Sequence, residues 1–217
     1  MKKVFAYGGV AASVVLIAFG IGSLVIGFAG RSEVRDSIAR EAIVGGEDMS
    51  PAAIRAAAKE AGLSASEIDV PSMNIIDEKI TTGDEAKAFA GYMRIHTLEA
   101  TGGLTYAEMG RFQAKPAAPA SETDGRGGTN NPELAVIDPK TKEPVSNPAR
   151  NIWVTETALT TALNTSFFAE RVAVWSIVMG TALLLTGVGF LVLTLGGALG
   201  TVPIPRRHPH TKPVPTT

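Results

Sequence analysis

The stretch "VFAYGGVAASVVLIAFGIGSLVIGFAG", residues 4–30, decides the fold, because it contains no charged side chain across 27 positions. A second stretch, residues 172–205, is uncharged across 34 positions. An α-helix rises about 1.5 Å per residue and the apolar core of a bilayer is about 30 Å thick, so roughly 20 apolar residues cross it. Both stretches therefore predict transmembrane helices. Two buried core helices of a soluble protein are the less favoured interpretation.

The first stretch also has one feature of a secretory signal peptide, because Lys2 and Lys3 precede the apolar run. The apolar core of a signal peptide is only about 7–15 residues long, however, and "GFAG" before Arg31 is a weak cleavage site. We therefore expect an uncleaved anchor.

The charges outside the two stretches predict the topology. The short ends carry basic residues and no acid, whereas residues 31–169 contain 14 basic and 20 acidic residues, a net charge of 14 − 20 = −6. Short basic flanks stay in the cytoplasm, while long loops cross largely regardless of their charge. We expect a protein of the plasma (inner) membrane of a bacterium, with both termini cytoplasmic and residues 31–169 outside.

Four segments follow from this topology. Residues 1–30 form a short cytoplasmic start and the first transmembrane helix, and residues 170–200 form the second. Residues 31–169 form the extracytoplasmic domain between them, with a flexible loop near 113–150 that is rich in proline, glycine and small polar residues. Residues 201–217 form a proline-rich tail that we expect to be disordered.

The extracytoplasmic domain has mostly helical patterns. The first span continues as a helix through "RSEVRDSIAREA", residues 31–42, and Gly45 and Gly46 end it. Ser50, Pro51 and Gly62 bound a second helix, and Thr82 or Asp84 begins a third that Gly102 and Gly103 close. The fold class is therefore mainly α, a two-helix transmembrane hairpin with a mostly helical extracytoplasmic domain.

Three finer features complete this reading. Thr105 and Glu108 form a capping-box pattern for a further short helix, residues 105–112. "LAVIDPKTKEP", residues 134–144, predicts a strand pair around a turn at Asp138 and Pro139. The helix that begins at Pro148 or Ile152 runs into the second span, and we expect its stripe of Ala158, Ala162 and Phe167 to pack against Val34 and Ile38.

Small residues four positions apart predict helix packing inside the membrane, where close approach of backbones replaces the hydrophobic effect. Such pairs include Ser23 and Gly27, Ser176 and Gly180, and Gly196 and Gly200, and they could serve contacts within the chain or with a partner.

His96 is the one candidate centre of chemistry outside the cytoplasmic tail. Glu99 lies on the same helix face at i+3, Tyr92 lies one turn earlier, and Tyr106 follows. A histidine with a carboxylate can perform acid–base chemistry or bind a metal. A non-haem iron site requires two histidines and a carboxylate, and the sequence has no HxxxH or HExxH pattern. We therefore predict no catalytic residue and no metal site, and name these four as a tentative ligand- or partner-binding set.

Other chemistry is excluded more directly. The chain has no cysteine, which rules out disulfides, thiolate metal ligands and a cysteine nucleophile. It has no GxSxG motif and no phosphate-binding loop. The sequence therefore predicts no cofactor, no nucleic-acid partner and no enzymatic activity.

Two stretches carry a resemblance to a known family. "MRIHTLEATGGLTYAEM", residues 93–109, and "WVTETALTTALNTSFFAERVAVWSIVMGTALLLTGVGFLVLTLGG", residues 153–197, resemble a family of small two-span bacterial membrane proteins with no established activity. Some relatives are labelled aromatic ring-opening dioxygenases, an activity for which a single histidine in the outer domain does not supply the iron ligands. The resemblance implies a membrane hairpin with a helical outer cap and supplies no catalytic residue.

The sequence thus predicts an integral membrane accessory, assembly or scaffold protein that acts by protein–protein interaction through its extracytoplasmic domain. Its expected partners are membrane lipid and either another membrane or envelope protein or a second copy of itself. The alternative is an extracytoplasmic small-ligand binder or enzyme centred on His96.

Overall fold

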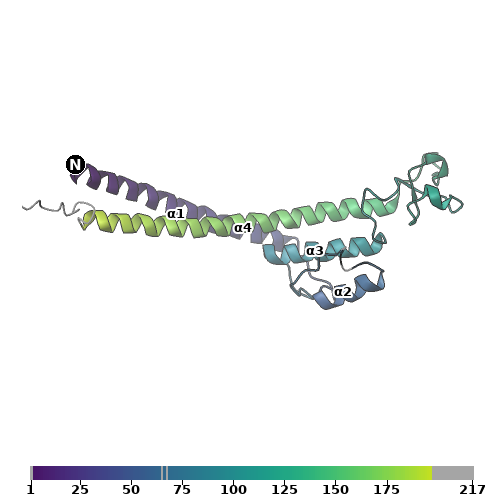
Figure 1. The fold of residues 1–217 in the computed structure, drawn as a ribbon, viewed down its shortest axis with the longest axis horizontal. Helices are drawn as coiled ribbons and strands as arrows, with labels where there is room; N and C mark the ends of the chain where they lie inside the picture. The colour runs from purple at the N-terminus through teal and green to yellow at the C-terminus, as the bar shows by residue number, and fades with distance from the viewer. Residues whose placement is uncertain (1, 65, 67, 197–217) are drawn as a thin grey trace, which may run out of the picture. The chain divides into compact units, whose positions relative to one another are not determined.

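The protein is mainly helical, as predicted. A computed structural model describes residues 2–64, 66 and 68–196 (Figure 1). The described residues form four α-helices, two short strands and two turns of 3-10 helix. In chain order these are α1 (Lys2–Arg40), α2 (Pro51–Glu60), α3 (Gly83–Ala100), β1 (Phe112–Gln113), η1 (Ala120–Glu122), β2 (Gly128–Thr129), η2 (Pro132–Leu134) and α4 (Pro148–Leu195). The predicted tail, residues 201–217, lies outside the described residues.

Two helices, α1 and α4, are long and apolar enough to cross a membrane, with mean hydropathies of 2.4 and 2.2 in their apolar parts. Only 11% of the most apolar part of each helix is buried within the protein. Large apolar side chains such as Phe19, Ile26 and Leu185 are instead mostly exposed. Helices in the core of a soluble protein bury such side chains, so this exposure does not fit the soluble alternative.

The chain divides into two compact units. The first, here called the helical pair, contains α1 up to Gly27 and α4 from Trp175 onward. The second, here called the head, contains residues 28–174. Each is described by itself.

The helical pair is held by close backbone contact at glycines. A Cβ on Gly20 would lie 2.7 Å from the Leu184 nitrogen, and one on Gly180 would lie 2.8 Å from the Gly20 oxygen. A Cβ on Gly187 would lie 2.8 Å from Cγ1 of Ile17. The order of these contacts makes the two helices antiparallel. Only glycine permits this approach, because a Cβ at these positions would clash with the opposite helix. Close packing of this kind is what holds helices together in a bilayer, where lipid provides no hydrophobic force between them.

The buried positions of the pair recur every seven residues. They are Ser13, Gly20 and Gly27 in α1 and Gly180, Gly187 and Thr194 in α4. Seven residues are close to two helical turns, so this spacing keeps one face of each helix against the other.

The predicted small-residue pairs had a four-residue spacing and identify only part of this contact. Gly27 and Gly180 are buried, Ser23 and Ser176 are half-buried, and Gly196 is exposed. Gly200 lies outside the described residues.

In the head, the predicted caps of α2 and α3 are confirmed. The Ser50 hydroxyl accepts from the Ala53 amide, Pro51 begins α2, and Gly62 follows its end with a φ of +81°. Thr82 rather than Asp84 caps α3, in a full capping box with Glu85. These caps satisfy backbone donors that a helix start leaves free.

Apolar residues from all four helices form one core in the head. They include Ile38 from α1, Ile54 from α2, Phe89, Tyr92 and Ile95 from α3, and Trp153 and Leu163 from α4.

The face that α4 turns toward this core differs from the prediction. Ala158 and Ala162 are exposed and Phe167 is half-buried, whereas Trp153, Glu156, Leu163 and Glu170 are buried. The buried stripe of α4 is therefore rotated from the predicted one, and it includes two acidic residues that are paired in the head. Val34 and Ile38 of α1 do belong to the core, as expected.

Two predicted helix boundaries also differ. The first helix ends at Arg40, before Gly45, and Ala42 takes a left-handed φ of 52°. Glu108 accepts hydrogen bonds from the Thr105 amide and hydroxyl, so only the glutamate half of a capping box forms, and only a turn follows. A single bonded turn is not stable without further propagation.

The flexible loop predicted near residues 113–150 contains backbone pairing. β1 and β2 are antiparallel, with Phe112 opposite Thr129 and Gln113 opposite Gly128. The predicted strand pair around Asp138 exists as an isolated bridge between Ile137 and Pro144.

Candidate functional site

A groove of about 790 Å³ runs along α3 in the head. Its lining comes from four segments: Ala88, Gly91, Ile95 and Leu98 of α3, Thr160, Asn164 and Phe167 of α4, Ile68, Pro71 and Met73 of the segment before α3, and Gly103, Thr105 and Glu108 of the segment after it. The groove is therefore a product of tertiary packing.

Gly91 allows the segment before α3 to approach the helix. A Cβ at this position would lie 2.7 Å from Cγ of Pro71. The absent side chain therefore sets how closely this wall of the groove lies against α3.

Glu156 is a buried carboxylate in the lining of the groove, only 3% exposed. Nη1 of Arg94 lies 3.5 Å from its Oε2, and the Arg94 guanidinium lies 3.8 Å from the centre of the Trp153 ring. Trp153 is itself fixed, because its Nε1 donates to the Leu104 carbonyl at 2.8 Å. Arg94 thus pairs with Glu156 and also lies over an aromatic ring.

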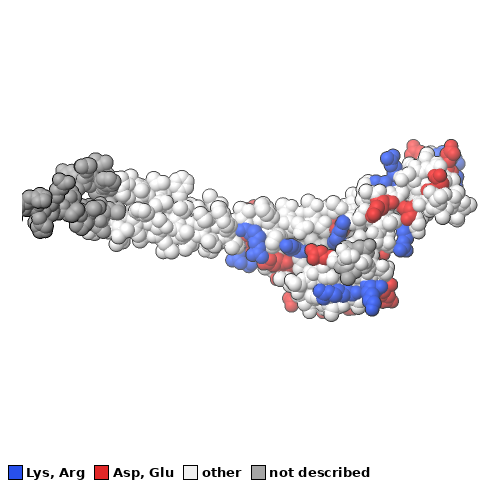
Figure 2. Space-filling model, in the orientation of Figure 1, with Lys and Arg blue, Asp and Glu red and all other residues white. Residues whose placement is uncertain are grey.

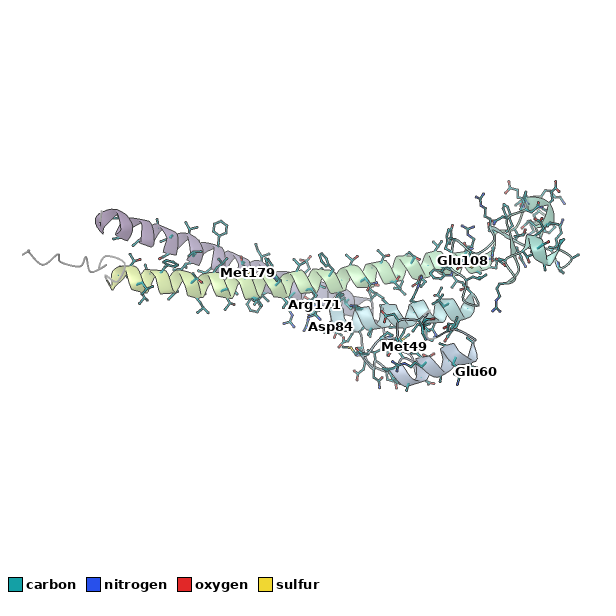
Figure 3. All side chains as sticks on the ribbon, in the orientation of Figure 1. Met49, Glu60, Asp84, Glu108, Arg171 and Met179 are labelled. Atoms are coloured by element: carbon teal, nitrogen blue, oxygen red, sulfur yellow. The ribbon has the colours of Figure 1, made fainter. Side chains whose placement is uncertain are left out.

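Three charged side chains gather where α3 begins. Arg171 of α4 forms an ion pair with Asp84 of α3, and Figure 3 shows these two side by side. Nζ of Lys87 lies 4.7 Å from the ring centre of Phe167, and Arg171 lies 5.0 Å from the same ring. Lys87 forms no ion pair with any residue that the structure describes. Its positive charge is therefore available at this end of the groove.

Glu170 joins three helices at the same end of the head. Its carboxylate, 7% exposed, accepts from Nε of Arg31 at 3.1 Å, Nε of Arg35 at 2.6 Å and the Gly83 amide at 2.6 Å. Because Gly83 begins α3, the carboxylate also faces the positive end of that helix dipole. One residue thereby ties α1, α3 and α4 together.

The four residues predicted as a binding set are only partly together. Nδ1 of His96 lies 3.0 Å from Oε2 of Glu99, as predicted, and Nε2 lies 3.4 Å from Oδ2 of Asp48. Tyr92 is instead a core residue, fully buried, whose hydroxyl donates to the Met73 carbonyl at 2.8 Å. Burial raises the pKa of the Tyr92 hydroxyl, against an opposing effect of Arg55. Tyr106 lies apart beneath the guanidinium of Arg150 at 3.9 Å.

His96, Glu99 and Asp48 form a small cluster, here called the histidine cluster. It links two segments, the turn at Asp48 and α3. None of its residues lines the groove along α3. Among the described residues, no group of three or more histidine and acidic side chains is arranged to hold a metal ion.

Sequence reasoning missed Lys87, Arg94, Glu156 and Glu170 as site residues. One signal was present for the two glutamates. Glu156, Leu163 and Glu170 are spaced by seven, and these glutamates are the only charged residues between Arg150 and Arg171. Acids on the same face as a leucine in an otherwise uncharged helix indicate buried, paired carboxylates.

The chain matches no protein-family model, no curated protein and no solved structure. The resemblance to two-span bacterial membrane proteins therefore stays a prediction from the sequence.

Proposed function

We propose that this protein is an integral membrane accessory or scaffold protein of the bacterial inner membrane, whose head binds another membrane or envelope protein along α4. One observation carries the proposal. From Asn151 to Glu170 the only charged side chains of α4 are Glu156 and Glu170, and both are buried. The exposed face of this segment, here called the α4 face, therefore carries no charge.

An uncharged exposed helix face is unusual in a water-exposed domain, where charged residues cover the solvent side. Val154 and Phe168 are 56% and 67% exposed on the α4 face, with exposed Ala158, Thr161, Ala162 and Thr165 between them. Small side chains let another helix approach closely. In the view of Figure 2 the surface along this part of α4 is mostly white, while charges gather elsewhere on the head. These features support helix-to-helix binding.

The membrane part of the proposal rests on the two long apolar helices. Both termini lie in the cytoplasm and the head lies outside, because the basic residues flank the apolar stretches at the chain ends.

The test introduces one charge on the α4 face. The full chain, tagged at its C-terminus, is extracted in a mild detergent, and co-purifying proteins are quantified. Ala158→Glu should abolish association with a stoichiometric partner, because a carboxylate would be desolvated at the contact. Ala56→Glu, at an exposed alanine of α2, is the matched control and should leave association intact.

Three results would contradict the proposal. The first is a partner that binds Ala158→Glu as well as the wild type. The second is a chain that purifies only with itself at a defined size, which would make it a homo-oligomer. The third is loss of function in His96→Ala with normal association, which would favour a ligand site at His96.

A further inference from the structure

We propose that the groove along α3 binds an anionic amphiphile, with its alkyl chain in the groove and its anionic group against Lys87. The inference rests on the membrane location in the proposed function and is independent of the protein partner. It concerns a different surface from the α4 face.

The size and lining of the groove suit an alkyl chain. A volume of about 790 Å³ lies in the range of small-molecule sites. Apolar side chains come from three of the four segments, among them Ile68, Met73, Leu98 and Phe167. The contributions from Thr160 and Asn164 are polar but uncharged, and the rest of the lining includes seven charged residues: Asp69, Asp84, Lys87, Arg94, Glu108, Glu156 and Arg171.

The charges at one end of the groove favour an anion there. Of the three basic residues in the lining, Arg94 is paired with Glu156 and Arg171 with Asp84, which leaves the charge of Lys87. Arg171 lies over the same Phe167 ring as Lys87 and supplies further donors beside it.

The acids of the lining set the direction of the ligand. Glu108 lies at the opposite end of α3 from Asp84 and Arg171 (Figure 3), where it accepts from Thr105. Asp69, on the segment before α3, is also in the lining and exposed. A negative head group is repelled by Glu108 and attracted to the Lys87 end.

The Lys87 end also contains the basic residue that directly precedes the second uncharged stretch in the sequence. Arg171 is followed directly by Val172, the first residue of the uncharged stretch. Basic side chains beside a transmembrane stretch meet anionic head groups. An amphiphile can therefore pass between the bilayer and the groove, which a free phosphate without a chain has no reason to do.

The experiment uses the full chain in nanodiscs of neutral phosphatidylcholine and a diazirine-labelled palmitate as the probe. After illumination, the labelled peptides are mapped by mass spectrometry. We expect labels in peptides from residues 84–105 and 156–171, in addition to labels in the apolar stretches. A diazirine-labelled alkyl alcohol of equal length tests the requirement for the anion and should label the head much less.

Two pairs of variants localise the site. Thr160→Trp fills the groove and should reduce head labelling to background, while Thr161→Trp, at the exposed neighbouring position, should not. Lys87→Gln should reduce it about fivefold, the effect of one partly exposed charge contact. Lys59→Gln on the exposed side of α2 should have no effect.

Labels confined to the apolar stretches would overturn the proposal, and so would head labelling that is equal in Thr160→Trp and Thr161→Trp. Inorganic phosphate that protects the head as well as palmitate does would show a simple anion site instead. Because no protein partner is present, these outcomes are separate from those of the α4-face experiment.

Discussion

At the scale of single residues, buried carboxylates organise the head. Glu170 accepts from two arginines and one helix-starting amide, and Glu156 meets Arg94 beside Trp153. Each carboxylate is retained in a buried position because charged donors replace the water it has lost.

We expect Glu170→Ala to lower the free energy of unfolding of the head by about 2 kcal/mol, because the Gly83 amide and two guanidinium groups lose a charged acceptor. The measurement is urea unfolding of the full chain in a mild detergent. Trp153 fluorescence reports the head when Trp175→Phe removes the other tryptophan. Glu33→Ala, an exposed acid of α1, is the control and should change little. Equal stability of the two variants would show that Glu170 does not tie the helices.

Asp124 gives the region of β1 and β2 a dependence on pH. Burial opposes its ionisation, but hydrogen bonds from the amides of Gly110, Gly128 and Arg126 outweigh this and lower its pKa. A carboxyl whose pKa is lower in the folded state stabilises that state above its unfolded pKa, near 3.9. This stability is lost as the pH falls below that value and through the lower folded pKa.

We therefore expect the amides around β1 and β2 to lose protection from hydrogen exchange between pH 6 and pH 3, after correction for intrinsic rates. Asp124→Asn should have lower protection at pH 6 and a smaller change on acidification, because the amide side chain does not titrate. Glu122→Gln, an exposed acid in η1, should behave as the wild type does. An unchanged pH response in Asp124→Asn would assign the effect to other groups.

At the scale of elements, the helical pair depends on glycines with no room for a side chain. Gly180 and Gly189 lie in the same helix, but a Cβ on Gly180 would meet backbone atoms at 2.8 Å, whereas one on Gly189 would meet nothing within 4 Å.

Gly180→Leu should therefore destabilise the pair by about 1–3 kcal/mol, the usual cost of overpacking a close contact. Gly189→Leu is the matched control and should be neutral. Thermal unfolding of the full chain in detergent, followed by helical circular dichroism, compares the two. If both variants unfold at the wild-type temperature, α1 and α4 do not pack at Gly180.

At the scale of the whole molecule, the absence of cysteine makes the topology directly testable. A single cysteine introduced by Ser121→Cys in the head should react with an impermeant maleimide in intact spheroplasts. One introduced by Thr211→Cys in the tail should react only after permeabilisation, because basic flanks stay in the cytoplasm. The reverse pattern of labelling would invert the proposed orientation.

Much of the fold could be predicted because its signals are local. The helix starts are marked by local features. Ser50 and Thr82 accept hydrogen bonds from amides within a few residues, and Pro51 occupies the first position of α2. The two apolar stretches need only their length and composition to be recognised. The end of α1 was misplaced because Gly45 and Gly46 are strong breakers, while the actual end at Arg40 lacks a glycine signal.

The candidate site was harder to predict, because it joins residues far apart in the chain. Folding places α3 between α4 and the segment that precedes α3. Only then does Lys87 contact Phe167, and only then does Gly91 contact Pro71. His96 and Glu99 were found because a spacing of three on one helix already places them together. Asp48, which completes their contacts, comes from another segment.

The sequence by itself determined the helical class, the two apolar helices and the starts of α2 and α3, since each depends on periodicity, length or a local hydrogen bond. Only the tertiary structure decided which face of α4 is buried, and with it the pairing of Glu156 and Glu170, the groove along α3 and the uncharged α4 face. The physical reason is that a carboxylate stays in water unless a partner replaces that water, and the local sequence does not show where such a partner lies. Its position depends on whether folding brings arginines and amides close enough to replace water.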